Sequence, residues 1–161
     1  MKIRKAEDSD LLTIMKIYDI GRKFMRAHGN YSQWKGNYPS ESMIKEDIKK
    51  ERCYVLVDKD NVPHGVFVYI YGEEPEPLYK EIKEGQWLNN KPYAVVHRLA
   101  SDESEKGIGT FCLSWALSKS HNVKIDTHPD NKVMQKLLSK LGFTACGLVR
   151  ALQDNDPRIG Y

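Results

Sequence analysis

The sequence predicts a mixed α/β layer fold, and three observations lead to this fold class. The chain has 161 residues, which is about the length of one domain. Apolar residues recur at helical spacing early in the chain, and a hairpin pattern follows them. After residue 93 the pattern runs strand, helix, strand, helix, strand, as expected for strands of one sheet connected by helices. We therefore expect a single domain over residues 1–161.

The N-terminal half predicts two helices and a β-hairpin. The helices show apolar residues on one face, and the strands are short apolar runs separated by a polar turn. The expected elements are an edge strand over 1–5, helices over 8–27 and 40–51, and strands over 53–57 and 64–71. An aromatic-rich loop over 31–38 separates the helices, and a long connection over 73–90 follows the hairpin. Long connections in compact domains are often functional.

The C-terminal half predicts a right-handed strand–helix–strand unit over 94–127 and a second helix with further strands. The helix patterns end at polar residues or at Gly142, which is typical of a helix C-terminus. The expected elements are strands over 94–100, 123–127, 143–150 and 158–161, and helices over 107–120 and 131–141.

Charge and hydropathy exclude several classes of partner. Lysine and arginine total 25 and aspartate and glutamate total 22, so the net charge is only +3. This balance argues against nucleic acid and against an anionic membrane surface as partners. The longest apolar run, 66–71, is far shorter than the roughly 20 residues that span a bilayer. No apolar segment typical of a secretory signal follows Met1, so we expect a cytoplasmic protein.

Three widely spaced cysteines, Cys53, Cys112 and Cys146, predict reduced and mostly buried thiols. Their number is odd and no two are close in sequence, which favours neither a disulfide framework nor a metal site. No metal is therefore expected.

The segment Ser104-Glu-Lys-Gly-Ile-Gly-Thr110 lies between an expected strand and an expected helix. Glycines at positions 107 and 109 let backbone N–H groups approach a ligand closely. The first turn of the helix adds unpaired N–H groups and the positive end of its dipole, which together favour a phosphate or pyrophosphate. Neither a Walker loop nor a complete dinucleotide fingerprint is present, and the glycines alone are equally compatible with a tight turn.

Taken in order, these pieces resemble the GCN5-related N-acetyltransferase (GNAT) family. The acyl-CoA loop of that family reads Q/R-x-x-G-x-G/A, and here it reads S-E-K-G-I-G. An asparagine after the next strand and a Gly-Phe pair after the next helix are matched by Asn131 and Gly142-Phe143. The motifs cover residues 94–143, and the order of elements suits nearly the whole chain.

The resemblance implies a mostly antiparallel central sheet of six or seven strands with a parallel, splayed pair and about four helices. It implies an acetyl-CoA-dependent N-acetyltransferase that acts on a small-molecule amine through a ternary complex, and a homodimer is common in the family. Acetyl-CoA would be the cosubstrate. The residues expected to bind it are Leu99, Ala100, Ser104, Glu105, Lys106, Gly107, Ile108, Gly109, Thr110 and Asn131.

Two departures from the family pattern bear on catalysis. Ser104 stands where the loop usually begins with Gln or Arg. Leu137 and Leu138 occupy the region where a tyrosine often donates a proton to the leaving thiol. A catalytically impaired acyl-CoA-binding module of the same fold is therefore the alternative function.

The candidate bases are His97 and His128. His97 lies on the strand expected to flank the acetyl group, and an imidazole titrates near neutral pH. His128 ends the following strand, at the sheet edge where α/β sites collect. Each is also compatible with a structural histidine. Arg98 alternates with His97 and is expected to face the other way and to pair with a carboxylate, while Asp130 is expected to cap the following helix.

The acceptor pocket is expected to use loop aromatics. Trp34, Tyr38 and Trp87 are the candidate substrate-binding residues, although ordinary packing explains each equally well. The 73–84 segment carries five glutamates and two lysines. It is either a solvated loop or an acidic rim that favours a cationic amine.

Overall fold

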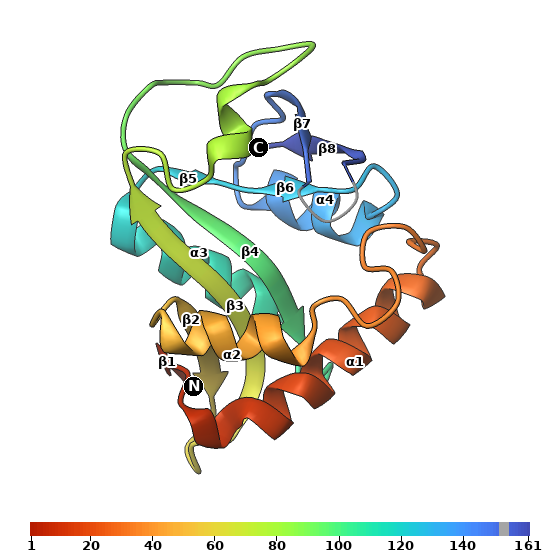
Figure 1. The fold of residues 1–161 in the computed structure, drawn as a ribbon, viewed down its shortest axis with the longest axis vertical. Helices are drawn as coiled ribbons and strands as arrows, with labels where there is room; N and C mark the ends of the chain where they lie inside the picture. Colours follow the sequence, from red (N-terminus) through yellow and green to blue (C-terminus); the bar gives the residue numbers. More distant parts are fainter. Residues whose placement is uncertain (152–154) are drawn as a thin grey trace.

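The computed structural model describes residues 1–151 and 155–161, and it confirms a mixed α+β fold with four helices in that part of the chain (Figure 1). The α-helices are α1 (Leu11–Ala27), α2 (Glu41–Lys49), α3 (Ile108–Ser120) and α4 (Lys132–Lys140). The strands are β1 (Lys2–Lys5), β2 (Cys53–Val57), β3 (Pro63–Gly72), β4 (Tyr93–Ser101), β5 (Val123–Lys124), β6 (Asp126–Thr127), β7 (Gly147–Arg150) and β8 (Pro157–Gly160). Two short 3-10 helices are η1 (Asp8–Asp10) and η2 (Pro77–Lys80).

The strands form two sheets rather than one. The larger sheet has the order β1-β2-β3-β4-β5 and the smaller one the order β6-β8-β7. All neighbours are antiparallel except β4 and β5. The strand expected over 123–127 is divided at Ile125, whose backbone exchanges two hydrogen bonds with Tyr161. At this residue the chain stops pairing with β4 and starts pairing with β8.

Helices cover both faces of the larger sheet. On one face α1 and α2 enclose a core that includes Ile14, Tyr18 and Ile48 (Figure 1). On the other face α3 packs through Cys112 and Leu113. The amphipathic pattern of α1 explains its position, since the apolar side of the helix is removed from water on the sheet. The three cysteines are free and buried, as the sequence predicts.

The parallel pair β4–β5 is short and lies at the edge of the larger sheet. Ala94 pairs with Val123 and Val95 with Lys124, and no further β4–β5 pair follows in the described residues. Beyond these pairs β4 continues to Ser101, while the other chain turns into β6 of the second sheet. The two sheets therefore separate alongside the second half of β4.

A β-bulge interrupts β4 at this separation. Val68 pairs with His97 and Val66 with Ala100, so that Arg98 and Leu99 both lie opposite Phe67. Arg98 adopts a φ of 52°, a left-handed conformation that is uncommon for a non-glycine residue. The hydroxyl of Tyr18 on α1 donates to the carbonyl of Arg98 at 2.9 Å and holds the bulge in place.

A buried ion pair fixes the side chain of the bulge residue. Arg98 Nη2 lies 2.7 Å from Asp47 Oδ2, and the Asp47 side chain is only 3% exposed. The other carboxylate oxygen of Asp47 accepts a hydrogen bond from Arg52 Nε at 2.7 Å. The carboxylate partner expected for Arg98 is thus Asp47, and it ties α2 to the bulge.

A second polar cluster fastens the loop before α3 to the β2–β3 hairpin. His64 Nδ1 lies 2.7 Å from Asp102 Oδ2, and His64 Nε2 lies 3.0 Å from Asp58 Oδ2. Ser104 donates its hydroxyl and its backbone N–H to the other oxygen of Asp102. Hydrogen bonds with Asp58 and then Asp102 raise the pKa of His64 above 6.5.

Within the described residues, no helix is both long enough and apolar enough to cross a bilayer.

Removing the Asp47 carboxylate should destabilise the fold strongly. Asp47→Ala leaves the buried Arg98 guanidinium without its counter-charge, and such losses typically cost about 3–5 kcal/mol. We expect a matching decrease in the free energy of unfolding measured in urea. Glu46→Gln, on the exposed side of α2, is the control and should leave the unfolding midpoint nearly unchanged. Equal midpoints for both variants would contradict the importance of the Arg98–Asp47 pair.

The His64 cluster should make stability depend on pH. Because its pKa is raised on folding, the protonated imidazole stabilises the native state below pH 6.5, and this contribution is lost as the pH rises through the raised pKa. The melting temperature of the wild type should therefore exceed that of His64→Gln most at pH 6 and least at pH 9. A difference that grows from pH 6 to pH 9 would contradict this assignment.

Candidate active site

A cavity of about 310 Å³ lies where the two sheets separate. Its walls come from β4, from β6, from η2 and from the loop between α1 and α2. Its polar and aromatic lining residues include Trp34, Tyr38, Glu76, Tyr79, His97, Arg98 and Asp126. The bulge explains why His97 and Arg98 line the same cavity, although neighbours in a regular strand face opposite ways.

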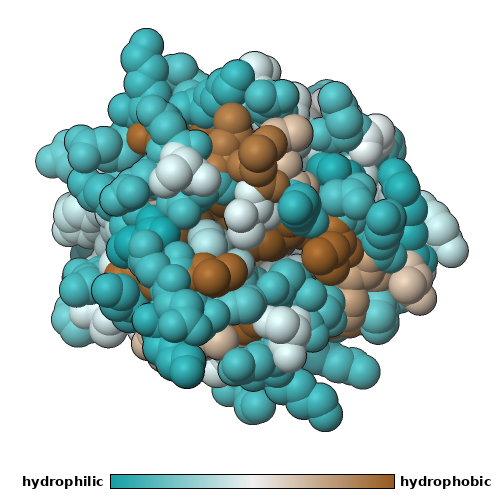
Figure 2. Space-filling model, turned by 90° about the horizontal axis from the view of Figure 1, so that it is seen from below, coloured by the Kyte–Doolittle hydropathy of each residue, from teal (hydrophilic) through white to brown (hydrophobic). Residues whose placement is uncertain are grey.

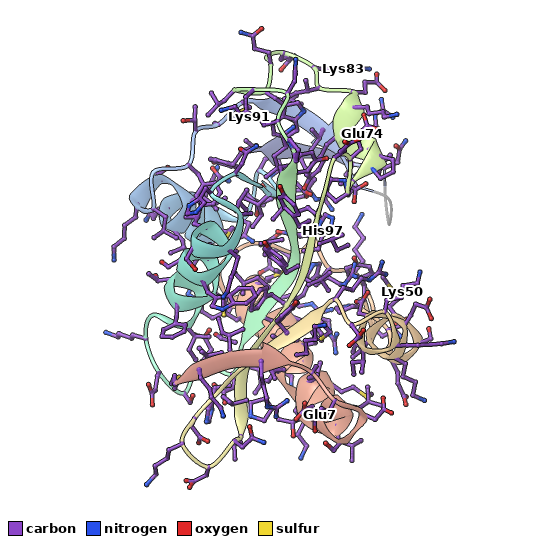
Figure 3. The ribbon with its side chains drawn as sticks, turned by 90° about the vertical axis from the view of Figure 1, so that its left-hand side faces the viewer. Glu7, Lys50, Glu74, Lys83, Lys91 and His97 are labelled. Carbon is purple, nitrogen blue, oxygen red and sulfur yellow. The ribbon has the colours of Figure 1, made fainter. Side chains whose placement is uncertain are left out.

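His97 projects from the middle of the molecule toward the long 73–90 connection (Figure 3). Its Nε2 lies 2.9 Å from Glu76 Oε2, and its Nδ1 lies 4.0 Å from Asp126 Oδ2. The hydroxyl of Tyr79 donates to the same oxygen of Asp126. Burial raises the pKa of Tyr79 well above 10, so this hydroxyl stays protonated at neutral pH. The cavity thus holds one imidazole between two carboxylates.

A second cavity, of about 410 Å³, forms a groove at the N-terminus of α3. It is lined by the 105–109 segment, by Leu137 of α4 and by Phe24 of α1. On the face where β4 ends, apolar residues gather in the middle and hydrophilic residues frame them (Figure 2). The groove therefore combines apolar walls with the start of a helix.

The glycines of the groove have separate structural roles. Gly107 precedes the first helical residue with a φ of 90°, which glycine adopts without strain. A Cβ atom on Gly109 would lie 3.1 Å from the side chain of Leu137 across the groove. Since the first N–H groups of α3 have no partner within the helix, they can bind an anion, and exposed Lys106 adds a positive charge.

The two cavities adjoin. Five residues line both of them, namely Met25, Trp34, Leu99, Asn131 and Met134. A ligand bound at the N-terminus of α3 can thus extend past Leu99 of β4 into the cavity that contains His97. An elongated ligand with an anionic group at one end fits this shape.

Most residues that the resemblance implies for acetyl-CoA binding come together in the groove. Those that line it are Leu99, Ala100, Glu105, Lys106, Gly107, Ile108, Gly109 and Asn131. Ser104 lies beside His64 and Asp102 instead, and Thr110 follows in the first turn of α3. Asn131 also caps α4 by accepting from the Met134 N–H at 3.0 Å, so the cap expected at Asp130 lies one residue later.

The three aromatic residues expected at the acceptor pocket lie in two different places. Trp34 and Tyr38 line the cavity that contains His97. Trp87 lies behind its wall, where its indole N–H donates to the Tyr79 carbonyl at 2.7 Å and Lys124 Nζ lies 4.3 Å above its ring. Trp87 thus supports Tyr79 rather than facing the cavity, because the long connection folds back over β5.

His128 lies outside the cavity lining. Its Nδ1 accepts the backbone N–H of Asp130 at 3.0 Å, and its carbonyl accepts from Gln135. These bonds shape the turn between β6 and α4. Nδ1 of His128 is thus engaged within the turn, and the role of His128 as a base stays a prediction.

Sequence reasoning missed the roles of Glu76, Tyr79 and Asp126. Glu76 belongs to the acidic connection, in which Glu74 pairs with Lys80 and Glu81 pairs with Lys83. Only the path of the chain shows that Glu76 turns inward, and no local pattern indicates it. For Asp126 the sequence offered one weak indication of a functional site, namely a polar residue at the end of a strand.

Comparisons with known proteins agree with the fold. No protein-family model and no curated protein matches the sequence. Among solved structures, a GNAT family acetyltransferase from Streptococcus agalactiae 2603 superposes with a TM-score of 0.87 at 29% identity, over 99% of this chain and 92% of that one. GNAT family acetyltransferases from Listeria monocytogenes 4b F2365 (TM-score 0.68, 13% identity) and Bacillus cereus ATCC 10987 (0.62, 22%) each match over 99% of this chain and 93% of their own.

The two more distant matches show the fold alone, and the Streptococcus agalactiae protein extends the likeness to the sequence. The chain therefore has the fold of the GNAT family acetyltransferases, and the family resemblance that its motifs carry is confirmed.

Proposed function

We propose that the protein is an acetyl-CoA-dependent N-acetyltransferase that passes an acetyl group directly to a small-molecule amine within a ternary complex. One observation carries the proposal: the groove at the N-terminus of α3 adjoins the cavity that contains His97. A pyrophosphate and a thioester at opposite ends of one ligand would match these two places.

The groove suits acetyl-CoA, which supplies the activated acetyl group as a thioester. The N–H groups of the first turn of α3, together with Lys106, would hold the pyrophosphate. Leu137 and Gly109 face each other across the groove and leave room for a narrow chain rather than a bulky group. Leu99 would lie near the thioester, because it lines both cavities.

The acceptor must lose a proton before it can attack. An alkylamine has a pKa near 10.4, so presenting it neutral at pH 7 costs about 4–5 kcal/mol. A positioned base offsets part of this cost, and His97 lines the cavity with a side chain that is 22% exposed. In the proposed step the amine nitrogen attacks the thioester carbon while the imidazole takes the proton.

The bulge of β4 is the candidate for stabilising the oxyanion that this attack creates. Two residues, Arg98 and Leu99, face one residue of β3, and a bulge of this kind turns backbone groups out of the ladder. A backbone N–H aimed at the developing charge is a donor already held in place before the reaction.

The residue expected to protonate the leaving thiol differs from the family pattern. Leu138 is fully buried in the core beneath α3 and cannot donate a proton. A thiol has a pKa near 8.5, so the thiolate can leave without full protonation when the C–S bond breaks. Leu138 is also the observation that favours the second candidate function, an acyl-CoA-binding module with impaired catalysis.

Acetyl-CoA should stabilise the protein through the groove. At a hundredfold excess over the dissociation constant, binding contributes about 2.7 kcal/mol, which corresponds to an increase of about 5–10 °C in melting temperature. Gly109→Val fills the groove beside Leu137 at a helical position without positive φ, and it should abolish most of this increase. The unliganded melting temperature of the variant is the control. An undiminished increase would place the ligand elsewhere.

His97→Gln should separate catalysis from cosubstrate binding. Loss of a general base costs about 10²–10⁴-fold in rate, so kcat for CoA release with an amine panel should fall by that factor. The affinity for acetyl-CoA should stay within a factor of two. His121→Gln, at the exposed end of α3, is the matched control. Unchanged turnover in His97→Gln would remove His97 from the mechanism. A wild type that binds acetyl-CoA yet acetylates no amine would favour the binding module.

A further inference from the structure

His97 has a carboxylate opposite each of its ring nitrogens, and the two carboxylates come from different parts of the fold. Glu76 precedes η2 in the long connection, and Asp126 begins β6. The two distances differ, since Nε2 is 2.9 Å from Glu76 and Nδ1 is 4.0 Å from Asp126. Only the first distance is a hydrogen bond, so the imidazole is held on one side and open on the other.

Glu76 is itself held firmly. Its Oε1 accepts the Leu78 N–H at 3.1 Å, and its backbone carbonyl accepts the Tyr79 N–H at 3.0 Å. The hydrogen bond with His97 lowers the pKa of Glu76, against the opposite effect of burial, so it is a carboxylate at neutral pH. A carboxylate only accepts hydrogen bonds. Nε2 must therefore carry the hydrogen, and the neutral imidazole keeps its lone pair on Nδ1.

The open side of the imidazole faces Asp126. The hydroxyl of Tyr79 fixes Asp126 Oδ2 by donating to it. His97 Nδ1 and Asp126 Oδ2 lie 4.0 Å apart. A donor atom placed between them, about 2.8 Å from each and with an angle of roughly 90° at the donor, would hydrogen-bond to both. A nitrogen with two N–H bonds, as in an alkylammonium ion, can donate to both groups from that position.

We propose that Glu76 is a positioning residue that holds His97 with Nδ1 as the base, and that Asp126 with Nδ1 receives the acceptor as an alkylammonium ion. This inference rests on the proposed function. The ammonium transfers one proton to Nδ1, and its nitrogen, now neutral, forms a bond to the thioester carbon. The C–S bond then breaks, its electron pair leaves on sulfur, and the thiolate takes the second proton from the former amine nitrogen, so that the products are the neutral amide and the CoA thiol. The imidazolium that results has an N–H facing each carboxylate.

The other charged groups near this arrangement do not compete for His97. Arg98 of β4 is paired with Asp47, and Arg150 of β7 lines the cavity on the side of η2 and β8. The tyrosines of the wall, Tyr38 and Tyr79, contact Arg98 and Asp126 respectively. Asp126 is therefore the carboxylate that faces a bound amine beside Nδ1. It favours alkylamines, which are cationic at neutral pH, over arylamines, which are uncharged.

The nitrogen chemical shifts of the His97 ring test the orientation without any turnover. The His97 signals in the ¹⁵N-labelled protein are those lost in His97→Gln. We expect the Nε2–H form in the wild type and a mixture of both neutral forms in Glu76→Ala. An Nδ1–H form in the wild type, or an unchanged spectrum in Glu76→Ala, would overturn the role of Glu76.

Kinetics with a panel of alkylamines, diamines, arylalkylamines and anilines test the rest. In Glu76→Gln, kcat should fall about 10–100-fold, because the imidazolium formed in the step loses the negative charge that faces its Nε2–H. Glu73→Gln removes a charge from the same loop at an exposed position and should leave kcat unchanged. Asp126→Asn should raise KM for the best alkylamine at least tenfold, with a smaller effect on kcat.

The outcomes separate this inference from the proposed function. A wild type that prefers anilines, or an Asp126→Asn variant with unchanged KM, would overturn the alkylammonium site while leaving acetyl transfer established. A wild type that acetylates nothing would overturn the proposed function, and the ring spectrum would still decide the orientation of His97.

Discussion

The buried contact between Arg98 and Asp47 is the constraint on which the candidate site depends. A non-glycine residue with positive φ in the middle of a strand is unfavourable, and it persists only where its surroundings hold it. Here α1 holds the carbonyl of Arg98 through Tyr18, and α2 holds its guanidinium through Asp47. Two N-terminal helices thus hold the middle of β4 from 51 and 80 residues away in sequence. A regular strand without a bulge would not need these contacts.

The bulge and the separation of the sheets act together. The bulge brings His97 and Arg98 to one cavity, and the change of partner at Ile125 moves β6 away from β4 to create its space. At the end of β4 the His64 cluster orders the loop that leads into α3. One strand therefore connects the end of the groove that would bind an anion with the cavity where an amine would react.

The sequence was sufficient for the features that depend on local periodicity and on ordered motifs. The four helices, the hairpin and the parallel pair follow from the spacing of apolar residues, and the glycines at 107 and 109 lead into a helix as expected. The division of the 123–127 strand was missed, because it depends on pairing with Tyr161 at the other end of the chain. Glu76 was missed for a similar reason, since its charge resembles that of its solvated neighbours and only the fold turns it toward His97. For Trp87 the sequence suggested a functional role that the fold does not give it. This loop aromatic packs against Tyr79 instead of facing the cavity.

The central claim is that one ligand runs from the N-terminus of α3 to the bulge of β4. A crystal structure with bound coenzyme A tests it most directly, since the positions of the pyrophosphate and the sulfur are both visible. The account predicts the pyrophosphate at the backbone of residues 106–109 and the sulfur beside Leu99, on the side of the cavity that contains His97. A sulfur that points away from this cavity, or a pyrophosphate bound elsewhere, would contradict the account.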